Sequence, residues 1–217
     1  MKPEAAAMLS GKRFSWFGHN PSTRISVTIM GVLTAVCGSG HGVAEIFQGS
    51  RPPVDIGTRI GAVTVLPDYF VTGVVAVILS LVILVWTVGF FHRKHGASVY
   101  LVLSVALFLS GGGVAQTAGI LVTFAAATRI NAPLRWWKGH MPTKLRKFLT
   151  GIWFPAMVLG YLLILTGIFL WIFLMPPGTI RRVGPAHYAC WSTLLSGLIF
   201  LLASIACGFA RDIERNH

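Results

Sequence analysis

The sequence predicts an all-α integral membrane protein with four to five transmembrane helices, and three observations support this class. Only 11% of the 217 residues are charged, whereas a typical soluble domain has about 25%. The mean hydropathy is +0.73. Long uncharged runs, sufficient to cross the roughly 30 Å hydrocarbon core of a bilayer, alternate with short basic segments. We therefore expect one helical transmembrane domain over residues 25–210, between a basic cytoplasmic N-terminal segment (1–24) and a short polar C-terminal tail (211–217).

The net charge of +12 is interpreted as a membrane signal, because the lysines and arginines lie between the apolar runs. In such positions basic residues set the topology and contact anionic lipid headgroups. We accordingly expect a lipid bilayer with anionic headgroups as the partner, and no nucleic acid. The location that follows is a cell membrane, and a bacterial cytoplasmic membrane in particular, which the chain crosses several times.

The first apolar run, Ile25–Ile46, is predicted to be an uncleaved transmembrane helix. It is rich in glycine and alanine, and such small residues let helices approach closely in lipid. It also contains His41 and Glu45, which are four residues apart and therefore lie on one helical face.

The second predicted crossing is Phe70–Phe91, after a nearly neutral loop that ends with Asp68 and Tyr69. It is followed by the short basic turn His92-Arg93-Lys94-His95-Gly96. Such a turn is typical of the cytoplasmic side of a membrane.

The third apolar run, Val99–Thr128, holds thirty residues without a charge or a histidine. As one straight helix it would be roughly 45 Å long, which exceeds the bilayer core. Three glycines that disfavour a helix, Gly111, Gly112 and Gly113, lie near its middle, and Gln116 follows them. Two interpretations are open: a helix that breaks at the glycines and returns to its starting side, or one long, tilted crossing.

The segment Arg129–Lys147 has six basic residues and no acidic one. Its two prolines prevent it from forming a single helix. Tryptophans beside basic residues are typical of a segment that lies on anionic headgroups. The predicted headgroup contacts are Arg135, Trp136, Trp137, Lys138, Lys144, Arg146 and Lys147.

Two further crossings are expected towards the C-terminus. One lies within Phe148–Met175 and contains Pro155, which either kinks the helix or marks its start. The other runs from Tyr188 to about Ala210.

The distribution of basic residues favours the broken form of the third run. If that run returns to its starting side, fourteen of the 18 lysines and arginines lie on the side of the N-terminus and four on the other. A simple crossing divides them almost equally, against the positive-inside tendency. We therefore predict four crossings, one re-entrant hairpin and two cytoplasmic termini.

Four polar residues near the outer ends of the crossings form the candidate site: His41, Glu45, Asp68 and His187. Together they are a hypothetical site for a divalent metal or for protons, because ionisable residues within a membrane are functional candidates. The spacing of His41 and Glu45 lacks the second histidine of a zinc-protease helix. Gln116 is expected to satisfy backbone groups freed at the glycines. No cofactor is predicted, and the metal ligands are left undefined.

Three functions are compatible with these residues. The first is a non-catalytic membrane component or accessory subunit, with a membrane protein partner or a second copy of the chain. The second is a small transporter or channel that uses the broken segment 99–128. The third is a membrane metal or redox protein built on His41 and Glu45. The sequence contains no recognised catalytic motif and only six acidic residues, so an enzymatic activity is not favoured.

Overall fold

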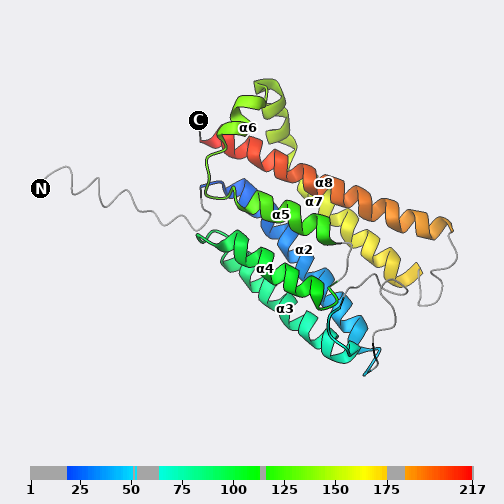
Figure 1. The fold of residues 1–217 in the computed structure, drawn as a ribbon. Coiled ribbons are helices and arrows are strands. Elements are labelled where there is room, and N and C mark those ends of the chain that lie inside the picture. Colours follow the sequence, from blue (N-terminus) through cyan, green and yellow to red (C-terminus); the bar gives the residue numbers. More distant parts are fainter. Residues whose placement is uncertain (1–18, 51, 53–63, 113–115, 175–183, 217) are drawn as a thin grey trace, which may run out of the picture.

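The fold is that of a computed structural model, which describes residues 19–50, 52, 64–112, 116–174 and 184–216. In this part of the chain there are seven helices and no β-sheet (Figure 1). The helices are α2 (Pro21–Ile46), α3 (Tyr69–Gly89), α4 (Gly96–Leu109), α5 (Thr117–Ala127), α6 (Arg135–His140), α7 (Thr143–Leu174) and α8 (Pro185–Arg215).

Four of these helices, α2, α3, α7 and α8, are long and apolar enough to cross a membrane. The predicted all-helical class and four of its long apolar helices are therefore confirmed. The helix ends differ from the expected ones by a few residues. α2 begins at Pro21, so Arg24 lies within its first turns, and α8 continues to Arg215, beyond the expected end at Ala210.

α2 and α3 pack closely because glycines on α2 face the neighbouring helix. A Cβ atom at Gly42 would lie 2.7 Å from the carbonyl oxygen of Gly73, and one at Gly31 would lie 3.0 Å from Cβ of Thr87. These distances leave no space for a side chain. The small residues of the first apolar run thus have the packing role that the sequence predicted.

The third apolar run is broken. α4 ends at Leu109 and α5 begins at Thr117. The two helices lie antiparallel, and the chain returns to the end from which it started (Figure 1). Asn131 Nδ2, after α5, donates a hydrogen bond of 2.7 Å to the carbonyl oxygen of His92, before α4. The ends of the run therefore meet, as the helix–break–helix interpretation predicted, and a single long helix is wrong.

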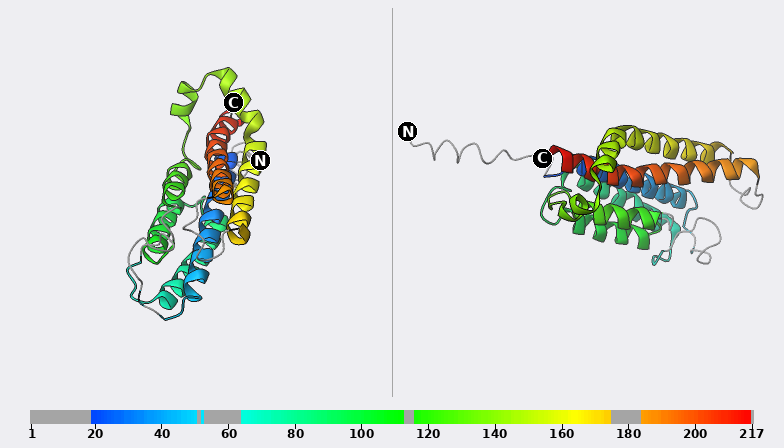
Figure 2. Two further views of the ribbon diagram at one scale, coloured as in Figure 1. Left: turned by 90° about the vertical axis from the view of Figure 1, so that its right-hand side faces the viewer. Right: turned by 90° about the horizontal axis from the view of Figure 1, so that it is seen from above.

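α7 and α8 form a second closely packed pair, in which glycines again allow the contact. A Cβ atom at Gly160 would lie 2.9 Å from the backbone nitrogen of Leu201. α7 continues through Pro155, so this proline does not mark the helix start. α2 lies between the α4–α5 hairpin and the α7–α8 pair, and it approaches α8 at one end only (Figure 2).

The segment Arg129–Lys147 is divided between two helices. α6 takes up Arg135 to His140, and α7 already begins at Thr143, so that Lys144, Arg146 and Lys147 belong to the first turns of α7. The prolines 133 and 142 precede these two helices, where the missing N–H is tolerated. The helix expected within 148–175 therefore begins earlier, at Thr143, and the contact of this segment with headgroups stays a prediction.

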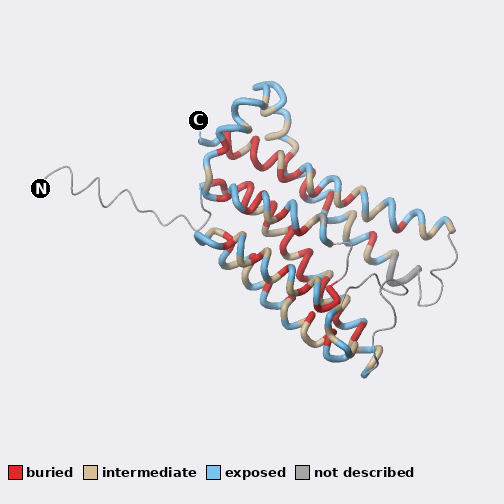
Figure 3. The backbone as a smooth tube through the Cα atoms, viewed as in Figure 1, coloured by how far each residue is buried: buried red, intermediate tan, exposed pale blue. Residues whose placement is uncertain are grey.

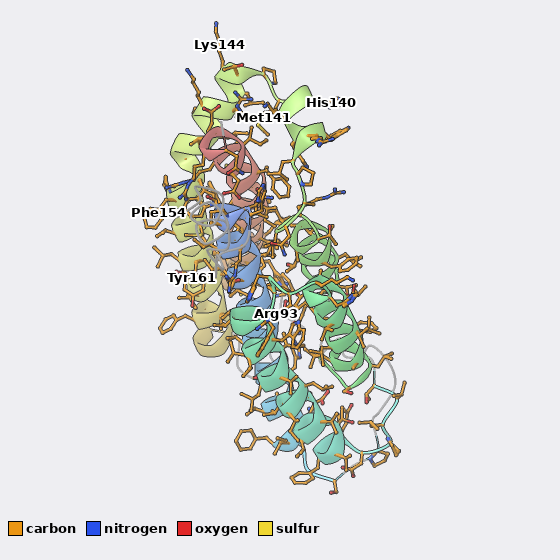
Figure 4. All side chains as sticks on the ribbon, turned by 90° about the vertical axis from the view of Figure 1, so that its left-hand side faces the viewer. Arg93, His140, Met141, Lys144, Phe154 and Tyr161 are labelled. Atoms are coloured by element: carbon orange, nitrogen blue, oxygen red, sulfur yellow. The ribbon has the colours of Figure 1, made fainter. Side chains whose placement is uncertain are left out.

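Large apolar side chains lie both in the core of this protein and on its outer surface. Large apolar side chains cover the outer faces of the long helices, and Phe154 and Tyr161, for example, point away from the bundle (Figure 4). Among the described residues, the interior contains, beside its apolar core, many serines and threonines and three charged side chains, namely those of Arg24, Glu45 and Asp212. Buried positions follow α2 and the C-terminal half of α8 (Figure 3).

Candidate functional site

The candidate site lies where the last turn of α2 meets the break of the third run. The side chain of Glu45 is fully buried, and neither carboxylate oxygen has a hydrogen-bond partner among the described residues. It faces Gly111: a Cβ atom at that position would lie 2.6 Å from Oε2 of Glu45. Both residues were candidates in the sequence analysis, but their contact with each other was not predicted.

The backbone at the break explains why a glycine is required there. Gly111 has a φ of +87°, a conformation that other L-residues rarely adopt. Gln116 donates a hydrogen bond from Nε2 to the carbonyl oxygen of Gly112, which is the stabilising role predicted for this amide. The backbone N–H of Val65 donates a 3.0 Å hydrogen bond to the carbonyl oxygen of Leu109, the last residue of α4 before the break. Gly113 lies outside the described residues.

A line of polar side chains continues from Glu45 along the same face of α2. His41 is half-buried one turn away. The Ser80 hydroxyl, from α3, would lie 2.5 Å from a Cβ atom at Gly38. Further along, Thr34 Oγ1 and the Tyr100 hydroxyl of α4 are 3.0 Å apart. Ser104 of α4 and Thr123 of α5 are fully buried as well, so α2 to α5 all contribute polar groups to the interior.

The other two residues of the predicted cluster, Asp68 and His187, make contacts of their own. Asp68 caps α3, where Oδ1 accepts a 3.0 Å hydrogen bond from the backbone N–H of Val71. His187 lies at the start of α8, beside Tyr188 and Trp191. Among the described residues, no three histidine, cysteine, aspartate or glutamate side chains are grouped as metal ligands. The four predicted residues therefore do not come together as a metal site, and Glu45 is the one of them that is fully buried.

No family model, curated protein or solved structure matches this chain. Any function must therefore be inferred from the geometry of the chain itself.

Two acidic residues that sequence reasoning placed in a polar tail organise the opposite end of the bundle. The Asp212 carboxylate is fully buried and accepts hydrogen bonds from Ser22 N (2.9 Å), Thr23 N (2.8 Å) and Thr23 Oγ1 (2.7 Å). It therefore satisfies free N–H groups of the first turn of α2 and lies at the positive end of its dipole. Glu214 forms an ion pair with Arg146 and joins α8 to α7.

Asn20 joins this end to the chain that follows α5. Its backbone N–H donates to the carbonyl oxygen of Ile130 at 2.9 Å, and its Nδ2 donates to those of Arg129 (2.6 Å) and Ala132 (2.9 Å). The start of α2, the turn before α4, the end of α5 and the end of α8 consequently lie together. All eleven lysines and arginines of the described residues are found at this end of the bundle.

The basic and the aromatic side chains of α6 line different cavities. Arg135 and Lys138 line a small cavity of about 160 Å³ together with Asn20. Trp136 and Trp137 line a larger cavity of about 450 Å³ between α5 and α8. The side chain of Lys144 instead points away from the bundle (Figure 4), and Arg146 is occupied by its ion pair.

Of the acidic residues in the described part of the chain, Glu45 alone combines full burial with unpartnered oxygens. Asp68, Asp212 and Glu214 each have a partner, which gives them structural roles. Binding one positive charge would remove the large cost of burying a lone carboxylate. A single carboxyl group is sufficient to hold a proton, whereas Ca²⁺ takes about six to eight oxygen ligands.

Proposed function

We propose that the protein is a multi-pass protein of the cell membrane, in which α2, α3, α7 and α8 cross the bilayer and the α4–α5 hairpin re-enters it. The apolar outer faces of the long helices support insertion, because a soluble protein rarely exposes such extended apolar surface. The fourteen and eleven residues of α4 and α5 correspond to roughly 21 and 16 Å, which is too short for two full crossings.

The orientation that we propose places the basic end in the cytoplasm, with both chain termini. The eleven described lysines and arginines at one end of the bundle support this orientation. A bacterial cytoplasmic membrane is the location most consistent with it. The tip of the hairpin, with Gly111 and Glu45, then lies towards the outer side.

Within this frame we propose that the protein is a small transporter that takes up a proton at Glu45. The observation that carries the proposal is the fully buried, unpartnered carboxylate against the left-handed glycine of a broken helix. Broken membrane helices typically line binding sites for ions. The polar side chains on the inner face of α2, with His41 nearest to Glu45, supply groups that can pass a proton onwards.

The test is proton flux in liposomes that contain the purified protein and a trapped pH-sensitive dye. With a K⁺ diffusion potential as the driving force, the wild-type protein is expected to acidify the lumen faster than protein-free liposomes. Glu45→Gln, which keeps the shape but cannot release a proton, should reduce this rate to the background. Asp68→Asn is the matched control, because this residue lies at the same end but caps a helix, and an asparagine can cap it too.

Two results would overturn the proposal. One is equal flux in the wild-type protein and Glu45→Gln, and the other is no flux above protein-free liposomes in either. The second result would favour the first function that the sequence suggested, a non-catalytic membrane component.

A further inference from the structure

The larger cavity at the basic end combines apolar walls with one cation. It lies between α5, α6 and α8, has a volume of about 450 Å³, and is walled by side chains such as those of Val122, Ala126, Leu202 and Ile205. A volume of this size is within the range of roughly 300–1,000 Å³ typical of sites for small ligands. α5 and α8 meet only sparsely here, so the cavity opens between the hairpin and the α7–α8 pair.

Arg129 supplies the charge. It lines the cavity just after α5, and its side chain is exposed and forms no ion pair with a described acidic residue. Its backbone is held in place, because its carbonyl oxygen accepts the 2.6 Å hydrogen bond from Asn20. The point from which this side chain reaches the cavity is therefore fixed by the fold.

Two tryptophans complete the site at the same end. Trp137 packs on Phe209 of α8, with ring centroids 5.0 Å apart, and Trp136 packs against Trp137 at 5.1 Å. Tryptophan is enriched at the headgroup level of membranes, where its ring contacts both apolar and polar groups. Apolar side chains, a cation and interfacial aromatic rings thus line one cavity, and these are the groups that an acyl chain, a phosphate and a headgroup region can contact.

We propose that this cavity binds one anionic phospholipid, with an acyl chain between α5 and α8 and the phosphate at Arg129. The inference rests on the proposed membrane location, but not on proton transport at Glu45. Charge complementarity supports this occupant: among the described residues, Arg129 is the one charged residue that lines the cavity, no acidic residue lines it, and Arg135 and Lys138 are next to the two lining tryptophans in the sequence. The lipid would fill the space between the hairpin and α8 and hold the hairpin against the bundle.

The test is native mass spectrometry of the purified full-length protein in mild detergent with phosphatidylglycerol or phosphatidylcholine of identical acyl chains. The wild-type protein is expected to retain phosphatidylglycerol in preference to phosphatidylcholine. Arg129→Gln should lower this preference about fivefold, which corresponds to about 1 kcal/mol for one basic residue at an anionic surface. Lys144→Gln, which removes an exposed charge of the same end that points away from the bundle, should leave it unchanged.

A second variant tests the acyl chain. Ala206 lines the cavity on α8, and Ala206→Phe should reduce retention of both lipids by filling the space. Inorganic phosphate separates the lipid from a free anion, since it should not displace the bound phosphatidylglycerol. Glu45→Gln should retain the lipid as the wild-type protein does, so that loss of proton flux and loss of this site are distinguishable.

The proposal is overturned if both lipids are retained equally, if Lys144→Gln acts like Arg129→Gln, or if phosphate displaces the lipid. Retention that Ala206→Phe leaves intact, in a variant that still migrates as a folded protein on gel filtration, would likewise exclude the cavity as the binding site.

Discussion

Glu45 and Asp212 are both fully buried carboxylates, yet their surroundings give them different roles. Asp212 accepts three hydrogen bonds at the start of α2, where the helix dipole favours a negative charge. Glu45 accepts none from the described residues and lies at the end of the same helix, where the dipole disfavours it. The first is therefore a structural residue, and the second is the one that we assign to proton uptake.

Replacing Asp212 with alanine is expected to destabilise the protein by about 2–3 kcal/mol, because charge-assisted hydrogen bonds are lost and buried N–H groups are left unpaired. The measurement is the thermal unfolding midpoint in detergent. Glu214→Ala is the control: its ion pair with Arg146 is partly exposed and should contribute no more than about 1 kcal/mol. An equal shift for the two variants would contradict the capping role.

The role of Asp212 was beyond sequence analysis, because its partners are about 190 residues away in the chain. A polar residue after an apolar run is usually part of a solvated tail, and no local pattern marks it as a cap for another helix. The full burial of Glu45 was not predicted, because the residue lies at the end of its apolar run, where a carboxylate is normally found at the headgroup level. The role of Asp68 as a helix cap could have been predicted, because an aspartate just before a helix is a common N-cap.

At the scale of elements, the break between α4 and α5 depends on Gly111. Gly111→Ala is expected to destabilise the protein by at least about 1–2 kcal/mol, because a left-handed residue with a Cβ atom is strained and the new atom would meet the Glu45 carboxylate. Gly139→Ala, with nothing near its Cβ position, should be neutral or slightly stabilising. Chemical denaturation monitored by tryptophan fluorescence compares the two, and an unaffected Gly111→Ala would refute the described turn.

The contact between α2 and α3 allows a similar comparison within one helix. A Cβ atom at Gly42 would meet the backbone of α3, whereas one at Gly40 would meet nothing within 4 Å. Gly42→Ala should therefore cost about 1–3 kcal/mol through overpacking, while Gly40→Ala should gain up to about 1 kcal/mol of helix propensity. If thermal midpoints of the two variants change alike, these helices do not pack through Gly42.

The sequence contained enough information to predict the break but not all helix ends. An apolar run that is too long for one crossing and carries three central glycines forms either a long, tilted helix or a broken one. The basic residues on both flanks favour the broken helix. The start of α7 at Thr143 was missed because tryptophans and basic residues also fit a surface segment. The continuity of α7 through Pro155 was left open, since a proline removes one hydrogen bond but does not always end a helix.

At the scale of the whole molecule, large apolar side chains cover the outer faces of the long helices, and the basic residues of the described chain gather at one end. The first property suits a lipid environment, and the second gives the molecule a direction within it. The grouping of the basic residues depends on the third run returning to its starting side. If it crossed instead, the six basic residues of 129–147 would lie opposite the turn with Arg93 and Lys94.

The side on which the two flanks of the third run lie therefore tests the central claim. In a variant with Cys37, Cys190 and Cys207 replaced by alanine, single cysteines are introduced as Lys94→Cys and Arg135→Cys, both at exposed positions. Ser50→Cys, exposed at the other end of α2, serves as the control. A membrane-impermeant maleimide is added to sealed right-side-out and inverted vesicles. Re-entry predicts that positions 94 and 135 are labelled only in inverted vesicles and position 50 only in right-side-out ones, whereas labelling of 94 and 135 from opposite sides would contradict it.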